Sequence, residues 1–152
     1  MTRRKRTVVA LTGVLSILVI ATVCWAAFRL DRVVKVGIPE AYAAWTTADL
    51  IIDHMQAHDG AWPAGWPHLD VAATQRLHNG DALRCDPQDL PELVSVDWGF
   101  NPAAWIATNS QGTGVAARII TRTDGRAFRT VWHGAEPNEM IVEYLLTGKR
   151  RQ

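Results

Sequence analysis

The hydrophobic pattern begins with an uninterrupted apolar run near the amino terminus. Residues 7–28, TVVALTGVLSILVIATVCWAAF, carry no ionisable side chain except the thiol of Cys24. As a helix that rises about 1.5 Å per residue, this run would span about 33 Å, enough to cross the hydrocarbon core of a bilayer. The pattern therefore predicts a retained single-pass transmembrane anchor, and a cleaved signal peptide is the alternative.

Charge gives the run an orientation. The four cations of residues 3–6 precede it without an accompanying acid, whereas the cations that follow it are diluted by Asp31. Because positive charge favours the cytoplasmic side, we expect residues 1–6 to be a cytoplasmic tail and residues 7–28 to be the anchor in the cell membrane. Residues 39–152 then form an exported, extracytoplasmic domain.

Residues 29–38 are predicted to be a juxtamembrane joint, because Gly37 and Pro39 interrupt the helical pattern. Beyond it, apolar residues repeat at intervals of three and four, at Ile38, Tyr42, Trp45, Ala48, Ile52 and Met55. This spacing predicts a long amphipathic helix from Pro39 that ends at Gly60. The Trp-Pro steps after Gly60 predict a corner, and residues 68–77 predict a short helix.

The carboxyl-terminal half has a β pattern followed by one more helix. Residues 94–100 alternate like a strand, and Asp124-Gly125 between two β-rich runs predicts a hairpin with a two-residue turn, in which Thr123 faces Arg126. That register gives a core face of Ala117, Ile119, Thr121, Phe128, Thr130 and Trp132. It gives an outer face of Arg118, Ile120, Arg122, Ala127, Arg129 and Val131.

The last periodic segment runs from Pro137 to Gly148 and predicts a short C-terminal helix. The order of elements predicts an α+β fold, in which the long amphipathic helix packs on a small antiparallel sheet.

Two histidines raise the question of a metal site. His54 and His58 stand four residues apart on the predicted helix, the spacing that lets two imidazoles share a zinc ion. The residue after the first histidine is Met55, where zinc peptidases have a glutamate. A third ligand would have to come from a distant position, such as His68, His78 or His133. We expect no metal, no cofactor and no catalytic residue, and the alternative is a membrane-anchored metal-dependent hydrolase that uses His54 and His58.

Two groups of side chains form a candidate interaction surface. Arg118, Arg122 and Arg129 share the outer face of the hairpin, and Trp62 and Trp66 lie in the predicted corner. Charges on a sheet face also discourage edge pairing, and tryptophans at a corner also cover a core. We expect the tryptophans to point inward. The part of the chain after the apolar run is mildly acidic, which argues against a nucleic-acid partner, and nothing indicates a small-molecule substrate.

Residues 45–70 resemble type IV pilins and the pseudopilins of type II secretion. In those proteins a membrane helix precedes an amphipathic helix that ends in a turn with the pattern D/N-G-x-aromatic-Pro. The matching positions here are Leu50, Asp59, Gly60, Trp62, Pro63 and Leu69. Since no glutamate follows Gly13 in the apolar run, the resemblance implies a pilin-like domain on a fixed anchor. It implies a non-enzymatic binding or assembly role in the cell envelope, with a protein as the partner.

Overall fold

The structure is a computed structural model of the 152-residue chain. It describes residues 3–109, 117–128 and 135–149, and for residues 3–14 it describes only the course of the helix. Contacts between residues divide the chain into two compact units, Met1–Ile38 and Pro39–Gln152.

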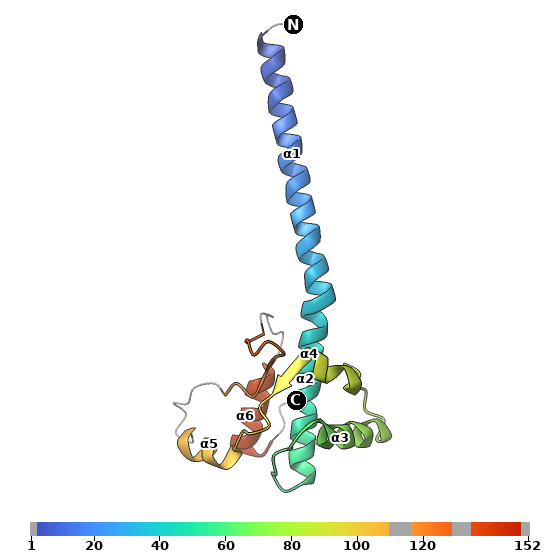
Figure 1. Ribbon diagram of the computed structural model, residues 1–152, viewed down its shortest axis with the longest axis vertical. Helices are drawn as coiled ribbons and strands as arrows, with labels where there is room; N and C mark the ends of the chain where they lie inside the picture. The colour runs from blue at the N-terminus through green and yellow to red at the C-terminus, as the bar shows by residue number, and fades with distance from the viewer. Residues whose placement is uncertain (1–2, 110–116, 129–134, 150–152) are drawn as a thin grey trace. The chain divides into compact units, whose positions relative to one another are not determined.

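The first unit is helical over its described length. Helix α1 (Arg3–Arg32) is followed by a π-helical segment, η1 (Val33–Gly37), and then by helix α2 (Ile38–Ala57) without an intervening turn (Figure 1). Residues 29–38 are therefore helical, and the interruption predicted from Gly37 and Pro39 is wrong. The Ile38 amide donates to the Val33 carbonyl across the wider π turn. Such a turn accommodates Pro39, because proline lacks an N–H and its ring clashes with the carbonyl four residues earlier in a regular α-helix.

The prediction of a transmembrane anchor at residues 7–28 is not supported. Within the described residues, no helix combines the length and the apolar character that crossing a membrane requires. The localisation predicted from the anchor, with residues 1–6 cytoplasmic and residues 39–152 extracytoplasmic, is therefore not supported either.

Helix α2 is the centre of the second unit. Every residue from 46 to 52 is buried, and two turns of consecutive residues cover the whole circumference of a helix. Neighbouring elements can approach α2 closely from several sides, because residues 41, 43, 44 and 48 are alanines with small side chains. The predicted apolar stripe is therefore only half right: Ala48, Ile52 and Met55 are buried, but Ile38 and Tyr42 are 41% and 44% exposed.

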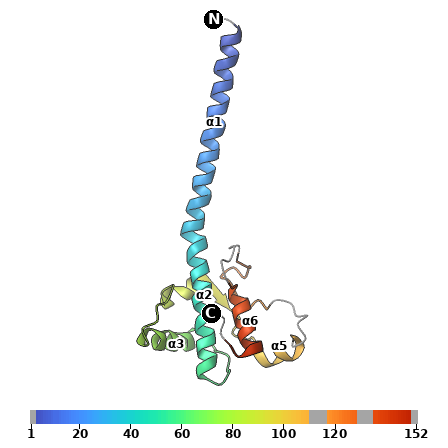
Figure 2. The ribbon, with the colours of Figure 1, turned by 180° about the vertical axis from the view of Figure 1, so that it is seen from behind.

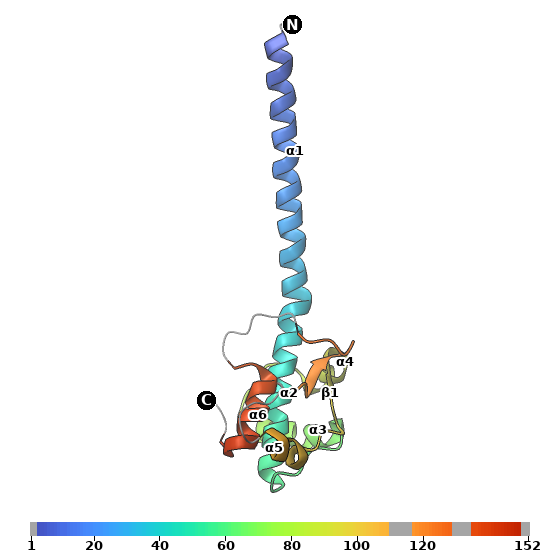
Figure 3. The same cartoon turned by 90° about the vertical axis from the view of Figure 1, so that its left-hand side faces the viewer.

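The elements that cover α2 come from the rest of the second unit. Helix α3 (Trp66–His78) lies on one side of α2 and helix α6 (Pro137–Thr147) on the other (Figures 1 and 2). The strands lie beside α2 as well (Figure 3). Leu69, Val94 and Ile141 from these elements join the buried cluster around α2. As the sequence predicted, α6 begins at Pro137 and stops at a glycine, because Gly148 directly follows its last residue and has a left-handed φ of 65°.

The prediction of an α+β fold is wrong, because helix far outweighs strand in the structure. The chain is mostly helical, and in its described part the sheet consists of two short antiparallel strands, β1 (Val94–Val96) and β2 (Ile120–Arg122), with Ser95 opposite Thr121. The alternating run at 94–100 stops early, because the Asp97 carboxylate accepts from the Gly99 amide at 3.0 Å and turns the chain. A helix that the sequence did not predict follows, α5 (Pro102–Asn109).

Helix α5 and the segment before β1 carried local signals that the periodicity did not show. Asn101 caps α5, since its Oδ1 accepts from the Ala104 amide at 3.0 Å, and Pro102 occupies the first turn. The segment before β1 contains the short helices η2 (Pro87–Asp89) and α4 (Leu90–Leu93). Asp86 caps η2 by accepting from the Gln88 amide.

Asn138 completes the small sheet. Its Oδ1 accepts from the amides of Ile119 at 2.9 Å and Ile120 at 2.7 Å, and its Nδ2 donates to the Ile120 carbonyl at 3.1 Å. Ile119 and Ile120 are each 1% exposed, so these backbone groups have little access to water. A side chain from the first turn of α6 thus takes the place of a third strand and satisfies the strand edge.

Replacing Asn138 by alanine should lower the free energy of unfolding by about 2–3 kcal/mol, because it leaves buried backbone groups without partners. Urea denaturation followed by circular dichroism measures the change. The matched control is Asn79→Ala at the exposed end of α3, for which we expect a change within about 0.5 kcal/mol. Equal effects of the two substitutions would contradict the bridging role of Asn138.

Candidate functional site

The corner between α2 and α3 brings together most of the chemistry that the sequence singled out. Helix α2 ends where the Gly60 amide donates to the Met55 carbonyl at 2.8 Å. Asp59 and Gly60 both have left-handed backbones, with φ of 52° and 83°, and reverse the chain. The following Trp-Pro steps lead into α3, with Pro63 buried and Pro67 in the first turn of the helix. The corner thus places α3 against the end of α2.

Three histidines form a stack at this corner. The ring of His54 lies between those of His58 and His68, with centroid separations of 4.1 Å and 5.1 Å and interplanar angles of 22° and 21°. His54 is 6% exposed, whereas His58 and His68 are exposed. Burial lowers the pKa of His54, and the neighbouring imidazoles of His58 and His68 lower it further.

Hydrogen bonds fix the roles of the two outer rings. Nδ1 of His58 lies 2.8 Å from the His54 carbonyl oxygen, so it carries a hydrogen and donates. The Ala64 amide donates to Nδ1 of His68 at 3.2 Å, so that nitrogen must be unprotonated. The two outer imidazoles are therefore held in different tautomers, one by α2 and one by the loop.

This arrangement does not suit a metal ion. Ring nitrogens bind a metal in the plane of the ring, whereas these rings face one another and two of their nitrogens already contact the backbone. Within the described residues, no group of three or more histidine, cysteine, aspartate or glutamate side chains could hold a metal. His78 lies at the far end of α3, and His133 lies outside the described residues.

The two tryptophans of the corner pack against the segment after β1. The Trp62 indole donates to the Asp97 carbonyl at 3.2 Å, and its ring meets that of Phe100 edge to face at 5.0 Å. Trp66 meets Trp98 edge to face at 5.2 Å. Both side chains are half-buried and contact the hydrophobic core. Their role in an interaction surface stays a prediction.

A small polar cavity of about 70 Å³ is lined by Thr46 and Asp49 of α2, Arg76 of α3 and residues 82–84. Nη1 of Arg76 lies 3.3 Å from Asp49 and 3.5 Å from Asp53, so one guanidinium serves two carboxylates. The Thr46 hydroxyl is buried and finds no hydrogen-bond partner among the described residues. A cavity of this size has room for a bridging water rather than for a substrate.

The sequence did not single out Arg76. Asp49 and Asp53 stand four residues apart, so they share one face of α2. Two carboxylates on an enclosed helix face need a cation from a neighbouring element. That pair was the signal that could have pointed to Arg76.

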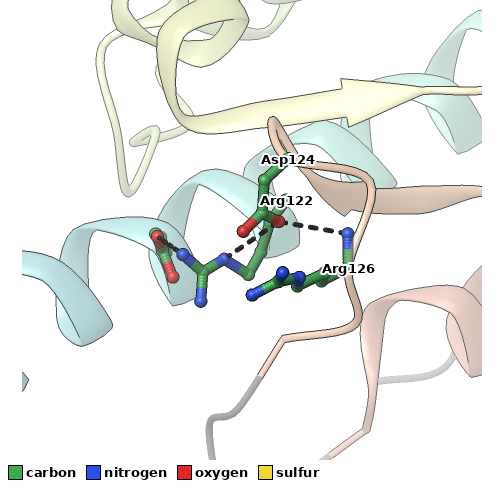
Figure 4. Close-up of polar contacts among 4 residues, drawn as sticks. Arg122, Asp124 and Arg126 are labelled. Atoms are coloured by element: carbon green, nitrogen blue, oxygen red, sulfur yellow. Dashed lines mark hydrogen bonds and ion pairs between the residues drawn. The ribbon is translucent and has the colours of Figure 1, made fainter.

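The arginines of the predicted outer face have separate roles. Nη2 of Arg122 lies 3.6 Å from Glu40 of α2, and its Nε lies 3.5 Å from Asp124 (Figure 4). Its side chain is 24% exposed, so Arg122 serves mainly to join the turn to α2. Arg118 is exposed, and Arg129 lies outside the described residues.

The turn after β2 has a three-residue loop, so the predicted pairing of Thr123 with Arg126 is wrong. The Arg122 amide donates to the Arg126 carbonyl at 3.0 Å, and the Gly125 amide donates to the Arg122 carbonyl at 2.8 Å. Gly125 has a left-handed φ of 74°, and three-residue hairpin loops with a glycine in this conformation are a common class. Arg126, which the sequence did not single out, therefore lies opposite Arg122 in place of Thr123.

The two faces predicted for the hairpin are only partly right. Ile119 is buried as predicted, but Ile120, which was placed on the outer face, is equally buried at 1% exposure. The chain is therefore covered on both sides where it enters β2. Thr130, Val131 and Trp132 lie outside the described residues.

Cys85 is a half-buried thiol with no sign of activation. Burial raises its pKa, and the carboxylates of Asp89 and Asp86 raise it further, against a smaller opposing effect of a backbone hydrogen bond from Asp86. The thiolate is the nucleophilic form of cysteine, so these surroundings disfavour a catalytic role.

Compared with models of known protein families, with curated proteins and with solved structures, the chain matches none. The resemblance of residues 45–70 to pilins stays a prediction.

Replacing Arg122 by alanine should lower the free energy of unfolding by about 1–2 kcal/mol, because it leaves the Glu40 carboxylate, 15% exposed, without its cation. Solvent reaches the pair, so we expect less than a fully buried pair would lose. Thermal and urea denaturation measure the effect. Arg118→Ala, at an exposed position, is the control and should change stability by less than about 0.5 kcal/mol. If Glu40→Gln does not reduce the loss caused by Arg122→Ala, the two side chains are not coupled.

Proposed function

We propose that this protein has a non-enzymatic binding or assembly role, in which the apolar surface of residues 15–38 is covered by a further copy of the same chain. The observation that carries the proposal is the exposure of large apolar side chains along α1 and η1. Trp25, Phe28 and Leu30 are 63%, 64% and 65% exposed. The other members of this surface are Leu15, Ile17, Leu18, Val19, Ile20, Val23, Val33, Val34, Val36 and Ile38.

An apolar surface of this extent is unusual for a protein that works alone in water. Monomeric proteins rarely expose contiguous apolar patches larger than a few hundred Å², and larger ones commonly mark an interaction site. Burial of one leucine or valine side chain contributes about 1.5–3 kcal/mol, so covering several of them gives a strong drive to associate.

The chemistry of the described side chains supports the non-enzymatic part of the proposal. The three stacked histidines contact one another and the backbone, and the Asp97 carboxylate is engaged in a turn. The raised pKa of Cys85 disfavours its thiolate. Among the described residues, no observation favours the hydrolase that would use His54 and His58.

The test is the association state of the full chain by sedimentation velocity at micromolar concentration. We expect assemblies rather than monomers. Leu18→Lys together with Val23→Lys should weaken association at least tenfold, because each replaced side chain would bring a charge into the covered surface. Both positions are exposed in the single chain, at 58% and 62%, so the fold of residues 39–149 should be unaffected.

The control for added charge is Gln56→Lys, at an exposed position of α2 outside the apolar surface. It should leave the association state unchanged. A wild-type chain that stays monomeric, or an association that the double substitution leaves intact, would overturn the proposal.

A further inference from the structure

We propose that the stacked imidazoles of His58, His54 and His68 act as an acid-sensitive latch, which holds the corner of residues 58–68 closed at neutral pH and releases it as the pH falls. The latch joins the end of α2 to the start of α3, because His54 belongs to α2, His58 directly follows it, and His68 belongs to α3.

The spacing of the rings is the first reason. Centroids 4.1 Å and 5.1 Å apart suit neutral imidazoles in van der Waals contact. Two positive charges at such distances repel one another, and the repulsion is stronger beside a group that is only 6% exposed than in bulk water. A charge on either neighbouring ring therefore opposes protonation of His54.

The hydrogen bond to His68 is the second reason. Its Nδ1 accepts from the Ala64 amide, and a protonated imidazole has no acceptor nitrogen. Protonation of His68 at Nδ1 thus breaks the bond that ties the loop to α3. His58 differs, because a protonated ring still donates from Nδ1 to the His54 carbonyl.

The surrounding charges do not offset this repulsion. The groups that act electrostatically on His54 are the imidazoles of His58 and His68, both of which disfavour its charged form. The carboxylates of Asp49 and Asp53 on α2 pair with Arg76 of α3 at 3.3 Å and 3.5 Å. The carboxylates next to the two outer rings in sequence, at positions 59 and 70, belong to exposed residues, so solvent screens them.

The direction of the pH effect follows from the linkage between proton binding and opening. The pKa of His54 is lowered in the closed state, so the opened or unfolded state binds more protons at any pH between the two pKa values. The closed state therefore loses stability as the pH falls below the ordinary histidine value of about 6.5, and the loss ends below the lowered pKa.

Release of the latch would free the aromatic side chains of the corner. Trp62 and Trp66 are held to the segment after β1 by one hydrogen bond and two ring contacts. They lie in the same stretch of chain as Ala64, whose bond to His68 is the one that protonation breaks. Acid would thus expose an aromatic surface that is half-covered at neutral pH.

Hydrogen exchange and ¹H–¹⁵N spectra of the full chain between pH 7.5 and 5 test the latch at two sites, the Ala64 amide and the Trp62 indole N–H. After correction for the intrinsic exchange rate, the opening equilibrium should rise by up to about tenfold per pH unit for each proton taken up. The amides of Leu50 and Ile51, in the middle of α2, should stay protected over the same range.

The variant that decides is His68→Gln, at an exposed position, because the amide oxygen can accept a hydrogen bond but does not titrate. It should reduce the pH dependence of opening at both sites, because it removes one of the two imidazoles whose charge disfavours protonation of His54. His78→Gln, at the other end of α3 and outside the stack, is the matched control and should reproduce the wild-type profile. Opening that does not change between pH 7.5 and 5, or an unchanged profile in His68→Gln, would overturn the proposal.

Discussion

The burial of the middle of α2, residues 46–52, on all sides is the constraint on which the second unit depends. A helix enclosed in this way cannot turn its polar groups to solvent, so the surrounding elements must supply their partners. Arg76 from α3 reaches Asp49, and Arg122 from β2 reaches Glu40. The Trp45 indole donates to a backbone carbonyl just ahead of α6 at 2.8 Å. These elements are thus held to α2 by a polar contact as well as by apolar packing, and the contacts fix where along the helix each one lies.

The same enclosure explains why the described sheet is so small. With α2 as the common core, each neighbouring element needs only to cover one side of a helix, and two strands of three residues suffice on the side they occupy. The remaining strand edge is closed by one side chain, Asn138, rather than by another strand. A polar side chain can do this only where the backbone around it is shielded from water, which α6 provides by carrying Asn138 in its first turn.

Local signals in the sequence predicted the elements that depend on local interactions. The helices α2 and α6 have apolar periodicity and a glycine at or just beyond the end, and both were predicted to within a few residues. Errors arose where the outcome depended on distant residues or on loop geometry. Gly125 allows hairpin loops of two or three residues, and the hydrogen bonds of Arg122 decide between them. That α2 is enclosed rather than amphipathic depends on how many elements pack on it, which its own sequence does not state.

The histidines of the corner show the same limit at the level of chemistry. Spacing alone makes His54 and His58 equally suited to chelate a metal or to stack, because both need two rings on one face of a helix. The choice is made by α3, which places His68 with its ring nearly parallel to that of His54 at 5.1 Å. A third imidazole that presented its nitrogen would have completed a metal site, whereas one that presents its face excludes the ion and leaves three titratable groups in contact. The orientation of one ring on the neighbouring helix thus decides which chemistry the pair at the end of α2 can perform.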